Sequence, residues 1–298
     1  MLRFLHFSDV HLTAHPLGWR KRDAFGKRLV GYTNIKLLGR GRRFRYAAQV
    51  VDALMAQAKR ESYDCMIFSG DATKLAFESE FALAAQRLGV GDPAFPQAIA
   101  VPGNHDYYIR RCVRAGYFEK YFAPWLQGER VDGETYPFAR KVGHAWLIAL
   151  NSSNHPYFNW NASGVVGRAQ LKRLKRLCAK LDPGPRILVT HYPLRTAKGK
   201  PERRSHRLLD HREALATAIE CRVSLWLHGH IHSPFVLQPS AQIPFPVICA
   251  GSATQVHRFA HNEYELEGAT LRMQRKVYEL ASGRFTDTER YQFALPSI

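Results

Sequence analysis

Five short segments of the chain place side chains that can bind metal ions directly after an apolar run. The segments have the patterns Asp-x-His, Gly-Asp, Gly-Asn-His-Asp, His and Gly-His-x-His. Each pattern alone is weak, because short motifs recur by chance. All five in order, each at the end of a predicted strand, predict one site. The candidate metal ligands are Asp9, His11, Asp71, Asn104, His191, His230 and His232.

The types of these side chains predict a pair of divalent transition-metal ions. Carboxylate oxygen and imidazole nitrogen suit Mn²⁺, Fe²⁺, Zn²⁺ or Co²⁺. Two such ions about 3.5–4 Å apart can hold an attacking hydroxide and stabilise a phosphate group during in-line displacement. Two cations this close need a shared anion, and Asp71 is the natural bridge because candidate ligands lie on both sides of it in the sequence.

The apolar runs before these ligands have the length of strands. They span 2–9, 64–71, 97–104, 186–192 and 223–230, and similar runs lie at 144–153 and 244–252. Such runs, bounded by turn residues, indicate buried strands. The spacing of apolar residues predicts helices over 44–60, 78–89, 167–181 and 210–220. This alternation predicts an α/β fold, in which ligands gather at the carboxyl ends of strands.

The last part of the chain has a different pattern. Residues 262–293 alternate apolar and polar side chains around Gly-centred breaks, which predicts antiparallel strands that close a second sheet. The sequence contains no internal repeat, low-complexity tract or convincing linker. We therefore expect residues 1–298 to form one domain.

Composition bounds the class of protein. Of the 298 residues, 46% are hydrophobic, which is enough for a sizeable core. No apolar stretch approaches the roughly 20 residues that span a bilayer. Arg3, His6 and Asp9 interrupt the first apolar run, so it does not resemble a signal peptide. The five cysteines lack Cys-x-x-Cys spacing, which indicates free thiols. We expect a cytoplasmic protein, or one on the inner face of the membrane.

A basic and apolar insertion, residues 17–46, follows the first candidate ligands. Between Arg20 and Arg45 it holds ten Lys or Arg and one acidic residue, Asp23, in a chain of formal net charge +18. Its five glycines argue against one continuous helix. The mixture of cations with apolar residues favours contact with anionic lipid. Single-stranded nucleic acid and a solvated structural loop are the alternatives.

The order of the motifs resembles that of the calcineurin-like metallophosphoesterase superfamily, and no ligand position is substituted. The resemblance implies a two-sheet β-sandwich flanked by helices. It implies one metal site with the ligands Asp9, His11, Asp71 and His232. It implies a second metal site with the ligands Asp71, Asn104, His191 and His230.

The same resemblance gives roles to the two residues after Asn104. His105 would stabilise charge on the phosphoryl oxygens and protonate the leaving oxygen. Asp106 would orient His105 and favour its protonated form. Pro102-Gly103 is expected to turn the backbone sharply so that these side chains reach the site.

Fold and metals do not identify the substrate within this superfamily. The basic and apolar insertion resembles that of members acting at membranes, including UDP-2,3-diacylglucosamine pyrophosphohydrolases of lipid A synthesis. The expected activity is therefore hydrolysis of a phosphodiester or pyrophosphate bond in a lipid-linked or membrane-surface substrate, with Mn²⁺ as the favoured metal. The alternatives are a soluble cyclic-nucleotide or nucleotide phosphodiesterase, a nuclease and a catalytically inactive metal-binding scaffold. Nucleic acid is the less favoured partner, and the sequence indicates no protein partner.

Overall fold

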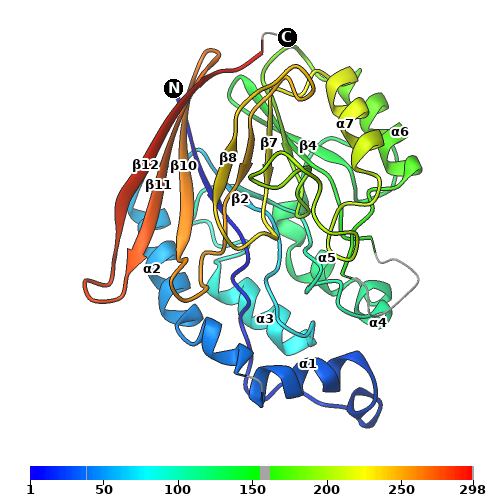
Figure 1. Ribbon diagram of the computed structural model, residues 1–298, viewed down its shortest axis with the longest axis vertical. Helices are drawn as coiled ribbons and strands as arrows, with labels where there is room; N and C mark the ends of the chain where they lie inside the picture. Colours follow the sequence, from blue (N-terminus) through cyan, green and yellow to red (C-terminus); the bar gives the residue numbers. More distant parts are fainter. Residues whose placement is uncertain (38, 155–161, 297–298) are drawn as a thin grey trace.

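Two six-stranded sheets form the centre of the protein, with helices on their outer sides (Figure 1). A computed structural model describes residues 1–37, 39–154 and 162–296. The first sheet has the order β12 (Arg284–Ala294), β11 (Thr270–Glu279), β10 (Ala260–Glu267), β1 (Leu2–Phe7), β2 (Cys65–Phe68) and β3 (Ala98–Ala100). The second has the order β4 (Phe138–Val142), β5 (Ala145–Ala149), β6 (Arg186–Val189), β7 (Leu225–His228), β9 (Val247–Cys249) and β8 (Phe235–Leu237). The predicted α/β class is confirmed.

Four helices outside the insertion fall where the apolar spacing predicted them. These are α2 (Ala47–Arg60), α3 (Glu78–Arg87), α6 (Arg168–Cys178) and α7 (His211–Glu220). The sequence analysis missed the short helices α4 (Arg110–Arg114), α5 (Tyr117–Tyr121) and η3 (Ala123–Leu126). They are too short for helical periodicity to show. All five cysteines are buried free thiols, as predicted.

Strand β5 shows why the central strands are apolar without interruption. Leu147 and Ala149 belong to the core shared by the two sheets, whereas Trp146 and Ile148 belong to the core beneath α6 and α7. Successive side chains of a strand point to opposite faces. A strand buried on both faces therefore needs apolar residues at every position.

The C-terminal strands are antiparallel as predicted, but they extend the first sheet instead of closing a second one. Strand β10 pairs with β1, so that Leu2 lies opposite Leu266 and His6 opposite Asn262. Strands β11 and β12 continue this antiparallel ladder, while β1, β2 and β3 are parallel. The alternating pattern identifies strands but not their partners, which explains the error.

The insertion folds as three short helical pieces, η1 (Lys21–Ala24), α1 (Lys27–Lys36) and η2 (Arg40–Phe44). Leu38 of the predicted stretch lies outside the described residues. Gly26 and Gly39, with φ of 106° and 69°, immediately precede α1 and η2. Strand β1 runs from the N terminus at the top of Figure 1 down toward α1. In the described ranges, no helix combines the length and apolar character needed to cross a membrane.

Buried Arg28 fastens the insertion to the loop after β2. Its guanidinium donates to Oδ1 of Asp23 at 2.7 Å, and its Nε donates to the carbonyl of Leu75 at 3.0 Å. A further bond reaches the carbonyl of Ala76, and the guanidinium lies 4.1 Å from the centre of the Phe77 ring. The single acidic residue of the insertion is therefore a structural anchor.

We expect Arg28→Met to lower the free energy of unfolding by about 3 kcal/mol, because it leaves buried Asp23 with one cation fewer and two carbonyls unpaired. Urea unfolding measures this change. Arg42→Met, which removes an exposed cation of the same insertion, is the matched control and should change stability by less than about 0.5 kcal/mol. Equal stability of the two variants would contradict the anchoring role of Arg28.

Candidate metal centre

All seven predicted metal ligands meet at the carboxyl ends of strands from both sheets. Three strands of the first sheet and two of the second contribute, and every ligand lies in the loop that follows its strand. Parallel strands place these ends at one edge of each sheet. The ligands follow β1 (Asp9, His11), β2 (Asp71), β3 (Asn104), β6 (His191) and β7 (His230, His232).

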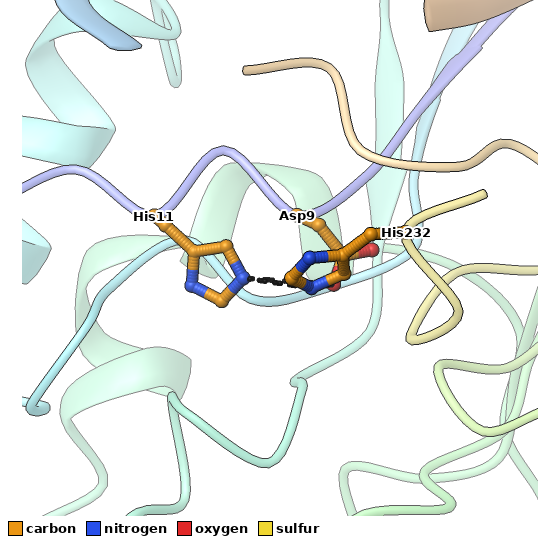
Figure 2. A group of neighbouring side chains, drawn as sticks. All are labelled: Asp9, His11 and His232. Atoms are coloured by element: carbon orange, nitrogen blue, oxygen red, sulfur yellow. Dashed lines mark hydrogen bonds and ion pairs between the residues drawn. The ribbon is translucent and has the colours of Figure 1, made fainter. Parts of the chain in front are cut away.

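Asp9, His11 and His232 form the first group of ligands (Figure 2). Nε2 of His232 lies 3.2 Å from Oδ1 of Asp9 and 3.3 Å from Nε2 of His11. Figure 2 shows the two imidazole rings turned toward each other, with the Asp9 carboxylate next to His232. One ligand atom from each residue lies within 4.8 Å of the other two, so a single ion can contact all three.

Asn104, His191 and His230 form the second group. The side-chain oxygen of Asn104 lies 3.1 Å from Nε2 of His191 and 2.9 Å from Nδ1 of His230. These two ring nitrogens are 3.3 Å apart. The group offers one amide oxygen and two imidazole nitrogens, all converging on one point.

Asp71 joins the two groups through a single oxygen. Its Oδ2 lies 3.6 Å from Nε2 of His11 and 3.5 Å from Nε2 of His191. Its Oδ1 accepts a hydrogen bond from the backbone N–H of His105 at 2.7 Å. Asp71 thus occupies the position that a bridging carboxylate requires.

The electrostatics of the site favour a bound cation. Burial raises the pKa of Asp71 well above its ordinary value, and the carboxylates of Asp9 and Asp106 raise it further. Burial lowers the pKa of His11 to about 4 and that of His230 well below its usual range. The imidazoles of His11 and His230 are therefore neutral, as metal binding requires, whereas burial at His232 is outweighed by the Asp9 carboxylate, which raises the pKa of that ring. Oδ1 of Asp9 is buried and accepts no hydrogen bond from the described residues, so the donor set fits divalent metal ions.

Neighbouring oxygens hold the second ring nitrogen of all four predicted histidine ligands. Such a bond fixes the orientation of the ring. In His230 the held nitrogen is Nε2, 3.0 Å from the carbonyl of His206, and in the other three it is Nδ1, which leaves Nε2 facing the site. The bonds run from His11 to the carbonyl of Thr73 (3.2 Å), from His191 to the carbonyl of Ser69 (2.8 Å), and from His232 to the side-chain oxygen of Gln255. The sequence analysis missed Gln255, because it belongs to no motif and reaches the site only through the fold.

Four of the predicted ligands have an unfavourable backbone conformation. The φ angles are 55° for Asp9, 44° for His11, 61° for Asp71 and 66° for His230. Positive φ is uncommon for residues other than glycine and costs about 1–3 kcal/mol each. Only seven non-glycine residues in the described part of the chain have positive φ, so more than half of them are predicted ligands. Backbone strain is therefore concentrated at the metal centre.

Gly103 begins the expected turn, because the backbone N–H of Tyr107 donates to its carbonyl at 3.1 Å, and it is also required for close packing. Its φ is not positive. A Cβ atom at this position would lie 2.0 Å from Oδ1 of Asp71 and 2.4 Å from the Asp71 nitrogen. Gly229 has a similar role, because its Cβ would lie 2.7 Å from Oδ2 of Asp9. The carboxylates of Asp71 and Asp9 therefore pack directly against the backbone of these two glycines.

His105 lies at the edge of the metal centre, where its ring meets that of His11 edge-on with centroids 4.8 Å apart. Its Nδ1 donates to the carbonyl of Lys74 at 2.7 Å, so Nε2 is the nitrogen left for substrate. Burial lowers the pKa of His105 well below its ordinary value, and nearby His11 lowers it further. Proton donation from Nε2 would therefore require an anionic substrate that favours the protonated ring.

Asp106 does not orient the ring of His105, which corrects a second expectation. Its buried carboxylate instead accepts hydrogen bonds from three backbone N–H groups. The donors are Asp71 (2.9 Å), Thr73 (3.0 Å) and Gly103 (2.9 Å). Asp106 therefore ties the loop after β3 to the loop after β2, which places Asp71 beside Asn104.

A two-sheet fold with this ligand set at one edge defines a metal-dependent phosphoester hydrolase. The chain belongs to the calcineurin-like phosphoesterase family, whose model matches residues 2–234. No curated protein sequence matches the chain.

Solved structures of low sequence identity share the fold. A dimetal phosphatase from Danio rerio is 13% identical, with a TM-score of 0.68 and 99% of each chain covered. The purple acid phosphatase PPD1 from yellow lupin (Lupinus luteus) is 13% identical with a TM-score of 0.60, and the match covers 98% of this chain and 53% of the lupin chain. GAP50, described as the anchor in the inner membrane complex of Plasmodium, is 14% identical with a TM-score of 0.55, over 100% and 89% of the two chains.

We expect Gly103→Ala to lower metal occupancy and activity together, because the new methyl group displaces Asp71. Metal analysis of the purified variant and its rate of ester hydrolysis measure both effects. Gly133→Ala is the matched control, since no atom lies within 4 Å of a Cβ there. A Gly103→Ala protein with full metal content and full turnover would show that Asp71 tolerates displacement.

We expect His105→Ala to slow turnover by about 10²–10⁴-fold and to retain both metals, because it removes a proton donor but no predicted ligand. The loss should be larger for alkyl than for p-nitrophenyl leaving groups, since the alkoxide needs the proton more. His15→Ala, at an exposed histidine, is the control. Equal slowing for both leaving groups would exclude proton donation, and loss of metal would make His105 a ligand.

Proposed function

We propose that the protein hydrolyses a phosphodiester or pyrophosphate bond in a lipid-linked substrate at an anionic membrane surface, on the cytoplasmic face. UDP-2,3-diacylglucosamine represents the substrate class that we favour, and Mn²⁺ the metal. The observation that carries the membrane part of the proposal is an outward-facing apolar surface on the insertion. Membership of the phosphoesterase family carries the chemical part.

The metal centre supplies the chemistry. Two divalent metal ions held by the predicted ligands would stabilise charge on the phosphoryl oxygens and lower the pKa of the attacking water. Asp71 lies between the two ligand groups and would keep the ions close together. Nε2 of His105 faces the same space and would donate a proton to the leaving oxygen.

Several exposed side chains at α1 are apolar. Leu29 and Val30 lie in α1, and Leu37 follows its last residue. All three are exposed, and Leu37 is 79% exposed. Phe25, just before the helix, is 83% exposed. The inward side of α1 carries Arg28 together with Tyr32 and Ile35, which pack against a buried apolar cluster.

The same insertion also exposes basic residues. Exposed cations of the insertion are Arg20, Lys21, Lys36, Arg42, Arg43 and Arg45. A segment that exposes both apolar groups and cations can bind anionic lipid, by burial of the apolar groups and attraction to the headgroups. The insertion lies at the end of the molecule toward which β1 runs, and Asp9 follows β1 (Figure 1). A membrane bound here would therefore lie at the same end as the metal centre.

We expect Mn²⁺-dependent hydrolysis of bis-p-nitrophenyl phosphate in preference to p-nitrophenyl phosphate, abolished by a chelator and restored by Mn²⁺. Asp71→Asn is the inactive control. No hydrolysis with both metals bound would favour a selective pocket or a metal-binding scaffold. A rate of diester hydrolysis that is the same with and without lipid vesicles would favour a soluble nucleotide substrate.

We expect the protein to sediment with vesicles of phosphatidylglycerol, and to do so less at high salt. The triple substitution Phe25→Ser, Leu29→Ser and Leu37→Ser should weaken binding at least about tenfold, because each buried side chain contributes about 1.5–3 kcal/mol. Ile219→Ser and Leu280→Ser, at exposed apolar residues outside the insertion, are the matched controls. Absence of binding at low salt would contradict the prediction and indicate that the insertion has a structural role.

A further inference from the structure

A cavity of about 170 Å³ lies between the metal centre and the insertion. Three histidines of the site, His11, His105 and His232, form one wall. The opposite wall comes from the insertion and from the loop after β2, and includes Arg43 and Lys74. A group held in this cavity would therefore be next to the reacting phosphate.

The lining of the cavity contains cations and no carboxylate, and the Glu80 carboxylate near Lys74 lies outside this lining. The side chains of Lys74 and Arg43 form no ion pair within the described ranges. The ammonium of Lys74 lies 5.4 Å from the centre of the Phe44 ring. Burial lowers the pKa of Lys74 to about 8, which shows that the charged form is poorly solvated. An arriving anion would offset this cost.

A third cation approaches from α1. The ammonium of Lys27 lies 4.3 Å from the centre of the Tyr108 ring, and that ring stacks on His105 with centroids 5.6 Å apart. Burial also lowers the pKa of Lys27 to about 8. The positive potential therefore extends from the cavity to the side of His105.

The position of the cavity is fixed by the fold. The ring of Phe44 packs 4.6 Å from that of His11, and the carbonyl of Arg43 accepts a hydrogen bond from the backbone N–H of Val256 at 2.7 Å. Gly31 of α1 also lines the cavity, and a Cβ there would lie 2.4 Å from the Tyr108 hydroxyl. The cavity is thus a packed junction between the insertion and the metal site.

We propose that this cavity binds a second phosphoryl group, adjoining the one that is cleaved, so that the substrate is a diphosphate and not a simple diester. Lys74 is the main contact of this group and Arg43 the second. This inference rests on the proposed function. In the reaction, water adds to the phosphorus at the metal centre, the bridging P–O bond breaks, and the second phosphoryl group leaves with the electron pair while Lys74 holds it. The products are two phosphomonoesters and one proton from the water.

Binding of α,β-methylene ADP and of AMP to the Mn²⁺-loaded protein tests the proposal without turnover, because the two ligands differ by one phosphoryl group. Calorimetry at matched free Mn²⁺ should show tighter binding of the methylene diphosphate. Lys74→Met should weaken that binding by about tenfold or more and leave AMP affinity within about threefold, since it removes one charge-assisted hydrogen bond. Lys74→Arg should retain most of the preference. Lys36→Met, at an exposed lysine of α1 outside this cavity, is the control.

Equal weakening of both ligands in Lys74→Met, or no weakening of either, would overturn the proposal. A preference for the diphosphate in a protein that hydrolyses no ester would overturn the proposed function alone. The source of the diphosphate is read from kcat/KM, using a soluble nucleoside diphosphate sugar and a lipid-linked diphosphate in vesicles. If Lys74→Met lowers kcat/KM for one of these two substrates more than it does for bis-p-nitrophenyl phosphate, the result supports the second phosphoryl site. The substrate that is affected identifies the source of the diphosphate.

Discussion

Two aspartates, Asp9 and Asp71, are buried side by side, and the rest of the structure depends on keeping them there. They follow neighbouring parallel strands, and the ladder between those strands continues past their ends: the N–H of Asp9 donates to Gly70 at 2.9 Å, and the N–H of His11 to the Asp71 carbonyl at 3.0 Å. Two carboxylates in a medium of low dielectric repel each other strongly. A bound cation removes that repulsion while both carboxylates stay ionised, and the backbone strain and glycine packing around them shape a site that fits such an ion.

Each predicted ligand belongs to a local motif, so the sequence could place it after a strand, where the fold brings the seven residues together. Asp9, His11 and Asp71 are recognisable from the apolar run before them and the turn residues around them. The partners of these ligands were not predictable in the same way. Gln255 reaches His232 from a segment 23 residues further along, and the carbonyl of Lys74 replaces Asp106 as the support of His105. Such contacts depend on how loops from different strands pack, which no periodicity encodes.

The charge of the insertion was visible in the sequence, but the sequence did not show which of its residues are buried and which are exposed. Arg28 and Asp23 differ from their neighbours only in being buried against each other and against the loop after β2. Leu29 and Leu37 differ from most of the other described leucines in being exposed. Periodicity alone gives the relative orientation of these side chains on α1, and the packing of Gly31 against Tyr108 decides which side faces the protein.

The pairing of β1 with β10 has a consequence for synthesis of the protein. Residues 2–6 find their antiparallel partners at 262–266, so the first sheet stays incomplete until most of the chain has left the ribosome. The ligand set from Asp9 to His232 is also spread over that length. During translation the carboxylates and imidazoles near the N terminus therefore stay solvated and unpaired until the later strands have been synthesised. Capture of metal belongs to the end of folding, and a chain stalled before β10 would expose an apolar sheet edge to aggregation.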